Sequence, residues 1–447
     1  MASLPRILGI GLALLVALSS LPARGAEAPE QVAIGLLDRL DAGDYAAAEA
    51  SFGPAMAAAV PADKLKAVWE ALPTQAGAAK GRGTPQVRIQ GGATLVVVPL
   101  HHANAELLAT IAVDAEGRVV GFLVSPAPPP PAAAPASDAT YIERDVSVGN
   151  GERALPGTLT MPKRASAKTP VPAIVLVHGS GPQDRDETIG PNRPFLDIAR
   201  GLAERGIASL RYDKRSKARP QDFAGGDFDM DDETTDDAVA AIAALRAPPG
   251  IDPARAYVLG HSQGGMLAPR IAARSGDVAG LILLAAPARP LLDILQEQNR
   301  YLLGADGSIE PAEQAFLDEL AGKVAAVRGA ATMAAKDTPL GLPAGYWRAF
   351  DAIDPVADAQ AITTPMLLLQ GGRDIQVVAA DWQRWCAALA DSPRATFKHY
   401  PALNHLGVAG KGAGTLAEYQ IVGHVDAQLI ADIANWIDAL ATTPAPG

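Results

Sequence analysis

The segment Gly260-His261-Ser262-Gln263-Gly264 places one serine hydroxyl among small residues, a spacing suited to nucleophilic chemistry. The apolar run AYVLGHS (256–262), typical of a buried strand, leads into it, and GGMLAPRIAARSG, typical of a helix, follows it. G-x-S-x-G between a strand and a helix indicates a sharp, strained turn that exposes the serine. Ser262 is therefore predicted to be a nucleophile, with the N-terminus of the following helix favouring negative charge beside it.

A serine hydroxyl is a weak nucleophile at neutral pH and needs a general base. Three histidines follow Ser262 in the chain, namely His399, His405 and His424. His399 lies inside a strand-like run and His424 inside a helical one, whereas His405 lies in PALNHLG, the loop after the last predicted strand. His405 is the predicted base, because a loop at that place can bring its imidazole over the serine.

The base needs a carboxylate to orient it, and with this motif the carboxylate comes between the serine and the histidine in the chain. Asp374 directly follows the strand-like run PMLLLQGG (365–372). Asp381 and Asp391 fall in or beside the next helical segment and fit less well. Asp374 is therefore the predicted acid.

Negative charge that develops on a substrate oxygen needs two backbone N–H groups aimed at it. The residue after the nucleophile, Gln263, is predicted to supply one of them. The loop HGSGP (178–182) follows the first long strand and is predicted to supply the other from Ser180. We expect His178 to brace this loop without acting as a base.

These residues follow strand-like runs, so a sheet must position them. Near-continuous apolar runs separated by helical patterns indicate an α/β fold with a doubly wound, mostly parallel sheet covered on both faces. Two strand-like segments upstream, joined by a turn with Asn150-Gly151, indicate an antiparallel hairpin that begins the sheet. The predicted core strands are 173–179, 207–213, 256–262, 280–287, 365–372 and 395–401.

Residues 288–362 interrupt the alternation and are mostly helical, which predicts a cap over the carboxyl ends of the strands. The segment GYWRAF near its end suggests that Tyr346 and Trp347 form walls of the substrate pocket. The cap has no long apolar stretch of the kind that a lipid tunnel requires, so we expect short acyl chains, roughly two to six carbons, to be preferred.

Residues 125–138, SPAPPPPAAAPASD, read as a stiff Pro/Ala linker that separates an accessory domain, 26–124, from a second domain, 139–447. In the accessory domain helical patterns precede strand-like runs, an α+β order that loosely resembles the NTF2-like fold and the domains of unknown function found ahead of exported hydrolases.

The 447 residues carry a net charge of −11 with no Lys/Arg cluster, which argues against nucleic-acid binding. Residues 1–25 combine Arg6, a short apolar run and small residues before Ala26, which predicts a signal peptide and a periplasmic or extracellular protein. An uncleaved anchor is the alternative; after cleavage no stable membrane insertion is expected. Cys386 is the only cysteine, so no intramolecular disulfide can form.

The motifs HGSGPQDRDE, LRYDKR, GHSQGG, QGGRD and LNH together resemble the α/β-hydrolase superfamily over roughly 139–441, in particular its exported carboxylesterase-like and dienelactone-hydrolase-like members. The resemblance implies a Ser262–His405–Asp374 triad and a small-molecule ester substrate. It also implies that no metal or organic cofactor is needed.

Two other functions stay open at this point. An exopeptidase could use the same triad if an acid such as Glu297 in the cap held a free amine. A binding protein without activity is the other, although folding alone does not require the serine, histidine, aspartate and glycine set. The sequence does not fix the oligomeric state.

Overall fold

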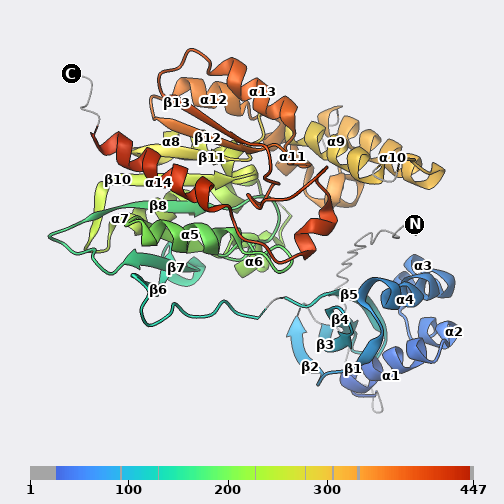
Figure 1. Cartoon of the computed structure of the whole chain (residues 1–447). Coiled ribbons are helices and arrows are strands. Elements are labelled where there is room, and N and C mark those ends of the chain that lie inside the picture. The colour runs from blue at the N-terminus through green and yellow to red at the C-terminus, as the bar shows by residue number, and fades with distance from the viewer. Residues whose placement is uncertain are drawn as a thin grey trace. The chain divides into compact units, whose positions relative to one another are not determined.

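The computed structural model describes residues 27–442, apart from 91–92, 129, 227, 277, 305–306 and 330–332. The chain divides into two compact units, one up to Pro130 and one from Pro131 (Figure 1). The predicted signal peptide, 1–25, lies outside the described residues. Within the described part of the chain, no helix has the length and apolar character needed to cross a membrane.

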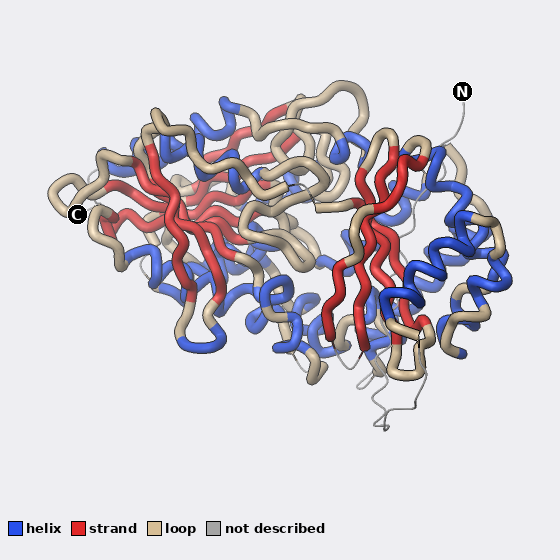
Figure 2. Tube along the Cα trace, turned by 90° about the horizontal axis from the view of Figure 1, so that it is seen from below, coloured by secondary structure: helices blue, strands red, loops and turns tan. Residues whose placement is uncertain are grey.

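The N-terminal unit has helices followed by an antiparallel sheet, an α+β arrangement. Buried side chains that alternate along β3 and β4 pack with those of α1, so the helices cover one face of the sheet (Figure 2). The likeness to the NTF2-like fold stays a prediction. The helices are α1 (Pro29–Asp41), α2 (Tyr45–Glu49), α3 (Pro54–Ala59) and α4 (Ala62–Ala76). The strands are β1 (Ala79–Arg82), β2 (Gln86–Gln90), β3 (Ala93–His102), β4 (Glu106–Val113) and β5 (Val119–Pro126).

The C-terminal unit is built on an eight-stranded sheet in the spatial order β13-β12-β11-β10-β8-β9-β7-β6. The pairs β6–β7 and β7–β9 are antiparallel, and the other neighbours are parallel. The predicted fold class, a doubly wound and mostly parallel sheet, is therefore confirmed. The strands are β6 (Tyr141–Val148), β7 (Leu155–Pro162), β8 (Val171–Val177), β9 (Ala208–Tyr212), β10 (Ile251–His261), β11 (Gly280–Leu284), β12 (Met366–Gly371) and β13 (Ala395–Tyr400).

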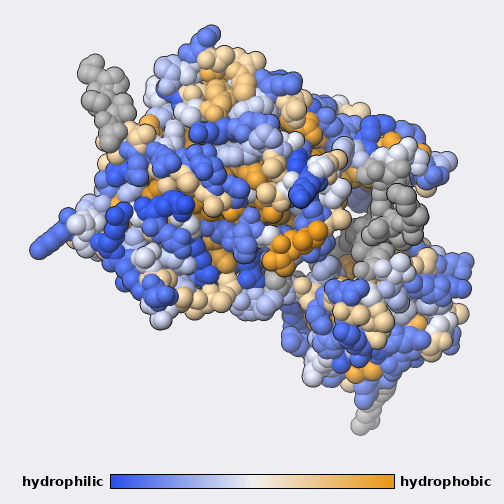
Figure 3. Space-filling view, viewed as in Figure 1, coloured by the Kyte–Doolittle hydropathy of each residue, from blue (hydrophilic) through white to orange (hydrophobic). Residues whose placement is uncertain are grey.

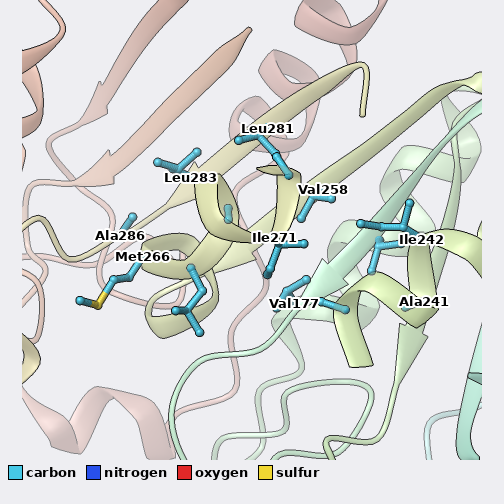
Figure 4. Packing of buried hydrophobic residues seen from close by; sticks show 14 of the residues in the cluster. Val177, Ala241, Ile242, Val258, Met266, Ile271, Leu281, Leu283 and Ala286 are labelled. Atoms are coloured by element: carbon cyan, nitrogen blue, oxygen red, sulfur yellow. The ribbon is translucent and has the colours of Figure 1, made fainter. Parts of the chain in front are cut away.

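Helices cover both faces of this sheet, and for that reason its central strands are apolar throughout. Met266 and Ile271 of α8 share one core layer with Val258 and Leu283 of the strands beneath (Figure 4). One face carries α5 (Pro194–Glu204) and α14 (Ala427–Thr442). The other face carries α7 (Asp236–Arg246), α8 (Gln263–Ser275), α12 (Pro355–Ala361) and α13 (Ala379–Ala388).

The helical insertion predicted to be a cap lies between β11 and β12. Its helices are α9 (Leu291–Leu303), α10 (Pro311–Gly329) and α11 (Ala344–Asp351). Helix α12, which was expected to be part of the cap up to residue 362, contributes buried Val356 and Ala359 to the layer of α8. Helices α10 and α11 contribute to the same core cluster, so the bounds of the cap, 288–362, stay a prediction.

Two short segments between β9 and α7 matter for the site. They are α6 (Arg215–Ala218) and a π-helical turn, Asp231–Thr235. On the face of the molecule drawn in Figure 3, hydrophilic residues predominate and apolar residues occur in separate groups. Apolar surface of this kind is ordinary for a folded chain in water.

Candidate active site

Ser262 lies in the turn between β10 and α8, where its backbone has φ 53° and ψ −119°. A positive φ is strained for a residue with a side chain, and it persists only where the surroundings hold it. Glycines make the turn possible: a Cβ atom on Gly260 would overlap the carbonyl oxygen of Gly264, and one on Gly264 would overlap that of Val177. The strained turn leaves Ser262 partly exposed at the N-terminus of α8.

His405 and Asp374 meet in a buried pair after the last two strands. Nδ1 of His405 donates to Oδ2 of Asp374 at 2.8 Å. The other carboxylate oxygen, Oδ1, accepts from the backbone N–H groups of Gln376 (2.8 Å) and Val377 (2.9 Å). These bonds fix the carboxylate, and with the proton on Nδ1 the neutral ring accepts a further proton on Nε2.

A hydrogen bond joins this pair to the serine turn. The ring of His261, the residue before Ser262, donates from Nε2 to the backbone carbonyl of His405 at 2.9 Å. The centroids of the His261 and His405 rings lie 4.6 Å apart. The structure therefore pairs the predicted base with the predicted acid and places their loop beside the turn of the predicted nucleophile.

The rival candidates lie elsewhere. His399 is exposed on β13 beside Trp382, and exposed His424 contacts Asp197. Buried Asp381 accepts from the backbone N–H of Ala288 at 2.9 Å and pairs with Arg289 at the entry to the cap. Asp391 is exposed after α13. None of these contacts involves the serine turn.

The predicted oxyanion loop lies against the nucleophile. A Cβ atom built on Gly179 would lie 3.3 Å from that of Ser262. In the part of the chain described, no oxygen accepts a hydrogen bond from the backbone N–H of Ser180 or Gln263, so both groups are available to a substrate oxygen. Nε2 of His178 bonds the carbonyl of Asp184 at 3.0 Å and braces the loop, as predicted. Burial lowers the pKa of His178 to about 4, so this ring is neutral at pH 7.

The sequence reasoning missed a second histidine–carboxylate pair. Oε2 of Glu187 lies 2.9 Å from Nδ1 of His261, without the alignment of a regular hydrogen bond, and both residues are buried. Oε1 of Glu187 accepts from the N–H of Gly179 at 2.6 Å. Glu187 has a positive φ of 52° and stands in the motif DRDE, but nothing in the order of residues connects it to His261.

The charges of this second pair follow from its contacts. Burial opposes the charged form of His261, yet the Glu187 carboxylate and the His405 carbonyl raise the pKa of the ring above its ordinary value. Burial also opposes the charged form of Glu187, but His261, His178 and the Gly179 N–H lower its pKa. These contacts favour the charged forms of both groups, and the pair joins the serine turn, the oxyanion loop and the His405 loop.

The cap is bonded to the loops that carry the predicted acid and base. From α9, the side-chain amide of Gln298 donates to the carbonyl of Gln376 at 2.8 Å. The hydroxyl of Tyr301, also in α9, donates to the carbonyl of Gly414 at 3.1 Å. Gln376 is two residues beyond Asp374, and Gly414 lies in the loop that continues from His405. Helix α9 therefore lies over this end of the sheet.

The predicted pocket walls are packed more deeply than the sequence suggested. Tyr346 and Trp347 are 4% and 3% exposed. The hydroxyl of Tyr346 donates to Glu233 at 2.9 Å, and Nε1 of Trp347 donates to the carbonyl of Pro339 at 2.9 Å. Their polar atoms are thus satisfied within the protein, and their contact with substrate stays a prediction.

A cavity of about 470 Å³ lies apart from Ser262, between the β6–β7 hairpin and α7. Val146, Leu159, Leu210 and Leu245 are among its walls, and no titratable side chain of the described residues lines it. This cavity therefore offers no acid or base among its described lining, and the predicted nucleophile stays Ser262.

Comparisons with known proteins show which families this chain resembles. Residues 168–408 match the family described as serine aminopeptidase, S33, and residues 34–122 match DUF3887, a family of unknown function. The chain is 36% identical over 377 residues to esterase EstD of Thermotoga maritima, covering 83% of this chain and 86% of that protein.

Two solved structures are more distant. Est1E from Butyrivibrio proteoclasticus has 16% identity and a TM-score of 0.43, over 67% of this chain and 99% of its own. An esterase from Pyrococcus furiosus has 14% identity and a TM-score of 0.42, over 70% and 97%.

The family match spans more than half of the chain, and the EstD alignment is too long to fit in either unit alone. Both agree with the resemblance found in the sequence motifs, which is confirmed. The chain belongs to the α/β-hydrolase family described as serine aminopeptidase, S33, as a serine hydrolase of the carboxylesterase type.

Proposed function

We propose that this chain is an exported serine carboxylesterase that cleaves esters of short acyl chains through an acyl-enzyme. The observation that carries the proposal is the buried Asp374–His405 pair, which His261 ties to the strained turn of Ser262. A serine, an imidazole and an orienting carboxylate in this order are the groups that acyl transfer requires. The name of the relative EstD supports an ester as the substrate.

In the proposed reaction, Oγ of Ser262 attacks the ester carbonyl carbon while Nε2 of His405 takes the hydroxyl proton. The N–H groups of Ser180 and Gln263 stabilise the negative oxygen of the tetrahedral intermediate. The bond to the alcohol then breaks, and His405 returns its proton to the leaving alcohol. Water attacks the acyl carbon on Ser262 in the same way, with His405 taking and returning the proton, and the carboxylic acid leaves.

Packing within the cap supports the preference for short acyl chains. The ring of Tyr346 packs on those of Trp347 and Phe350, with centroid separations of 5.5 Å, and all three side chains are buried. Each CH₂ of a substrate adds about 0.8 kcal/mol of binding only while the pocket can bury it. We therefore expect kcat/KM to peak at roughly two to six acyl carbons.

A p-nitrophenyl ester series and a fluorophosphonate probe test this proposal on the protein without residues 1–25. We expect labelling and ester cleavage, with both lost in Ser262→Ala. A maximum at roughly ten or more carbons would identify a lipase-like enzyme instead, because only a long apolar tunnel buries such a chain.

Aminoacyl anilides in the same panel test the exopeptidase alternative. Glu297, the acid suggested for binding a free amine, already contacts Arg289 at 2.6 Å. We therefore expect the anilides to be cleaved more slowly than the esters, and faster cleavage would establish the exopeptidase. Failure of both substrate classes and of labelling would favour a binding protein.

Export rests on the sequence of residues 1–25. Mass spectrometry of the protein recovered from cells tests it. An N-terminus at Ala26 is the expected result, whereas a full-length chain in the membrane fraction would indicate the uncleaved anchor.

A further inference from the structure

A buried ion pair beside the oxyanion loop has no part in the reaction described above. Lys214 comes two residues after β9, and Glu233 lies in the π-helical turn. Nζ of Lys214 and Oε1 of Glu233 are 3.3 Å apart, and both side chains are buried. Apolar side chains of the same volume often stabilise a fold as well as a buried ion pair does. Stability alone therefore does not explain why these two charged residues are buried here.

Lys214 also holds the backbone of the oxyanion loop. Its Nζ donates to the carbonyl of Gly179 at 2.9 Å. That carbonyl and the N–H of Ser180 belong to one planar peptide group, and in a trans peptide they point in opposite directions. By fixing the carbonyl, Lys214 fixes the direction of the N–H that is predicted to bind the oxyanion.

The preceding peptide group is held as well. Oε1 of Glu187 accepts from the N–H of Gly179 at 2.6 Å. The backbone N–H of Lys214 donates to the carbonyl of Gln183 at 3.0 Å, so the lysine segment and the loop are joined through the main chain too. These bonds leave Gly179 little freedom to turn.

Glu233 reaches the other predicted oxyanion residue and the cap. Oε2 of Glu233 accepts from the side chain of Gln263 at 3.4 Å and from the hydroxyl of Tyr346 at 2.9 Å. Burial opposes its charge, but Lys214 and the hydroxyl of Tyr346 lower the pKa of Glu233. The carboxylate is therefore ionised and fixes the ammonium group of Lys214.

We infer that Lys214 is a positioning residue of the oxyanion hole: held by Glu233, it orients the Gly179–Ser180 peptide so that the Ser180 N–H faces the reacting carbonyl oxygen. The inference rests on the proposed function for its effect on rate. The orientation of the peptide does not depend on that function and can be measured by itself.

The test compares three variants with wild type. Lys214→Met/Glu233→Gln removes the lysine donor and both charges together, which avoids leaving a charge buried alone. Glu233→Gln removes one charge and keeps the donor to Gly179. Lys217→Met is the matched control, because Lys217 is exposed in the same short segment.

With p-nitrophenyl butyrate, we expect the double variant to lose about 10²-fold in kcat with KM little changed, because an oxyanion donor acts in the transition state. Glu233→Gln should lose less, and Lys217→Met nothing. A crystal structure of the double variant should show the Gly179–Ser180 peptide turned or in several orientations.

The inference would be overturned if the double variant melts near the wild-type temperature and its kcat is unchanged. It would also be overturned if the Gly179–Ser180 peptide of that variant has the same orientation as in wild type. A double variant that fails to fold would overturn it too, since the pair would then be structural. If wild type neither cleaves esters nor takes the fluorophosphonate, the proposed function fails, and the crystal structure still decides whether Lys214 sets the peptide.

Discussion

Two buried histidine–carboxylate pairs lie side by side in the C-terminal unit, Asp374–His405 at 2.8 Å and Glu187–His261 at 2.9 Å. They differ at the far nitrogen of each ring. Nε2 of His261 donates to the carbonyl of His405. Nε2 of His405, in contrast, has no hydrogen-bond partner among the described residues. Both nitrogens of His261 therefore face acceptors, whereas one nitrogen of His405 is left free to take a proton.

The same two chemical groups therefore have different roles, and the difference lies in one free ring nitrogen. His405 is oriented by its carboxylate and left able to accept a proton, as a general base must be. Both ring nitrogens of His261 contact neighbouring groups, so we expect His261 to position the serine turn and the His405 loop. Removing each histidine should accordingly damage a different property of the protein.

The largest expected effect is on turnover in His405→Ala. We expect kcat to fall about 10⁴-fold with little change in Tm, because the base is lost while Asp374 keeps its backbone donors. Steady-state kinetics and thermal unfolding check this. Adding Ser262→Ala should cost little more, since the triad acts as a unit. An inactive His399→Ala or His424→Ala enzyme, with His405→Ala still active, would contradict the assignment.

His261→Ala should show the opposite pattern, with stability damaged most. Loss of the imidazolium leaves Glu187 buried without its partner, which costs about 3–5 kcal/mol in the free energy of unfolding. Glu187→Gln/His261→Gln should cost less, because no lone charge stays buried. Urea denaturation measures both. An unchanged free energy of unfolding in His261→Ala would erase the distinction between the two pairs.

The pH dependence of stability sharpens the comparison further. The lowered pKa of Glu187 stabilises the fold above its unfolded value, about 4.3, and this contribution fades as pH falls. The raised pKa of His261 stabilises the fold below its unfolded value, about 6.5, and this contribution fades as pH rises through the folded pKa.

Wild type should therefore exceed Glu187→Gln/His261→Gln in the free energy of unfolding most clearly between about pH 4.3 and 6.5. The neighbouring His178 has a pKa of about 4, so its ring is neutral over most of this range. A difference that stays constant from pH 4 to 9 would mean that the pair is not charged.

A smaller effect is expected at a further buried carboxylate, that of Glu233. Tyr346→Phe removes one donor but leaves Lys214 and Gln263 in place, so we expect a loss of about 1 kcal/mol in stability. Thermal unfolding and ester kinetics measure it. A loss of kcat as large as that of His405→Ala would place the tyrosine in the chemistry itself.

The smallest effect should come from removing the accessory unit. Because the two carboxylate–histidine pairs lie within the C-terminal unit, residues 139–447 should keep kcat/KM within about twofold. Full-length protein without residues 1–25 is the control. An insoluble or inactive fragment beside an active control would show that the accessory unit contributes to the site.

The sequence predicted the sheet and the Asp374–His405 pair because both depend on patterns along the chain. Apolar runs located the strands, and the loops after them located the acid and the base. Glu187 and Lys214 could not be found in this way, since their partners, His261 and the Gly179 carbonyl, are set by packing between loops far apart in the sequence. The sequence could not assign α12 to a layer for a related reason: it has a helical pattern like its neighbours, and only its packing on α8 shows where it lies.

The two hydrogen bonds from α9 to the carbonyls of Gln376 and Gly414 also bear on how this enzyme fails on heating. Segments with few buried contacts open locally below the temperature at which a whole domain unfolds. When α9 lifts, the loops of the acid and the base lose a common brace while the sheet is still intact. Activity should therefore be lost at a lower temperature than secondary structure. An inhibitor that contacts both α9 and Ser262 should bring these two temperatures together.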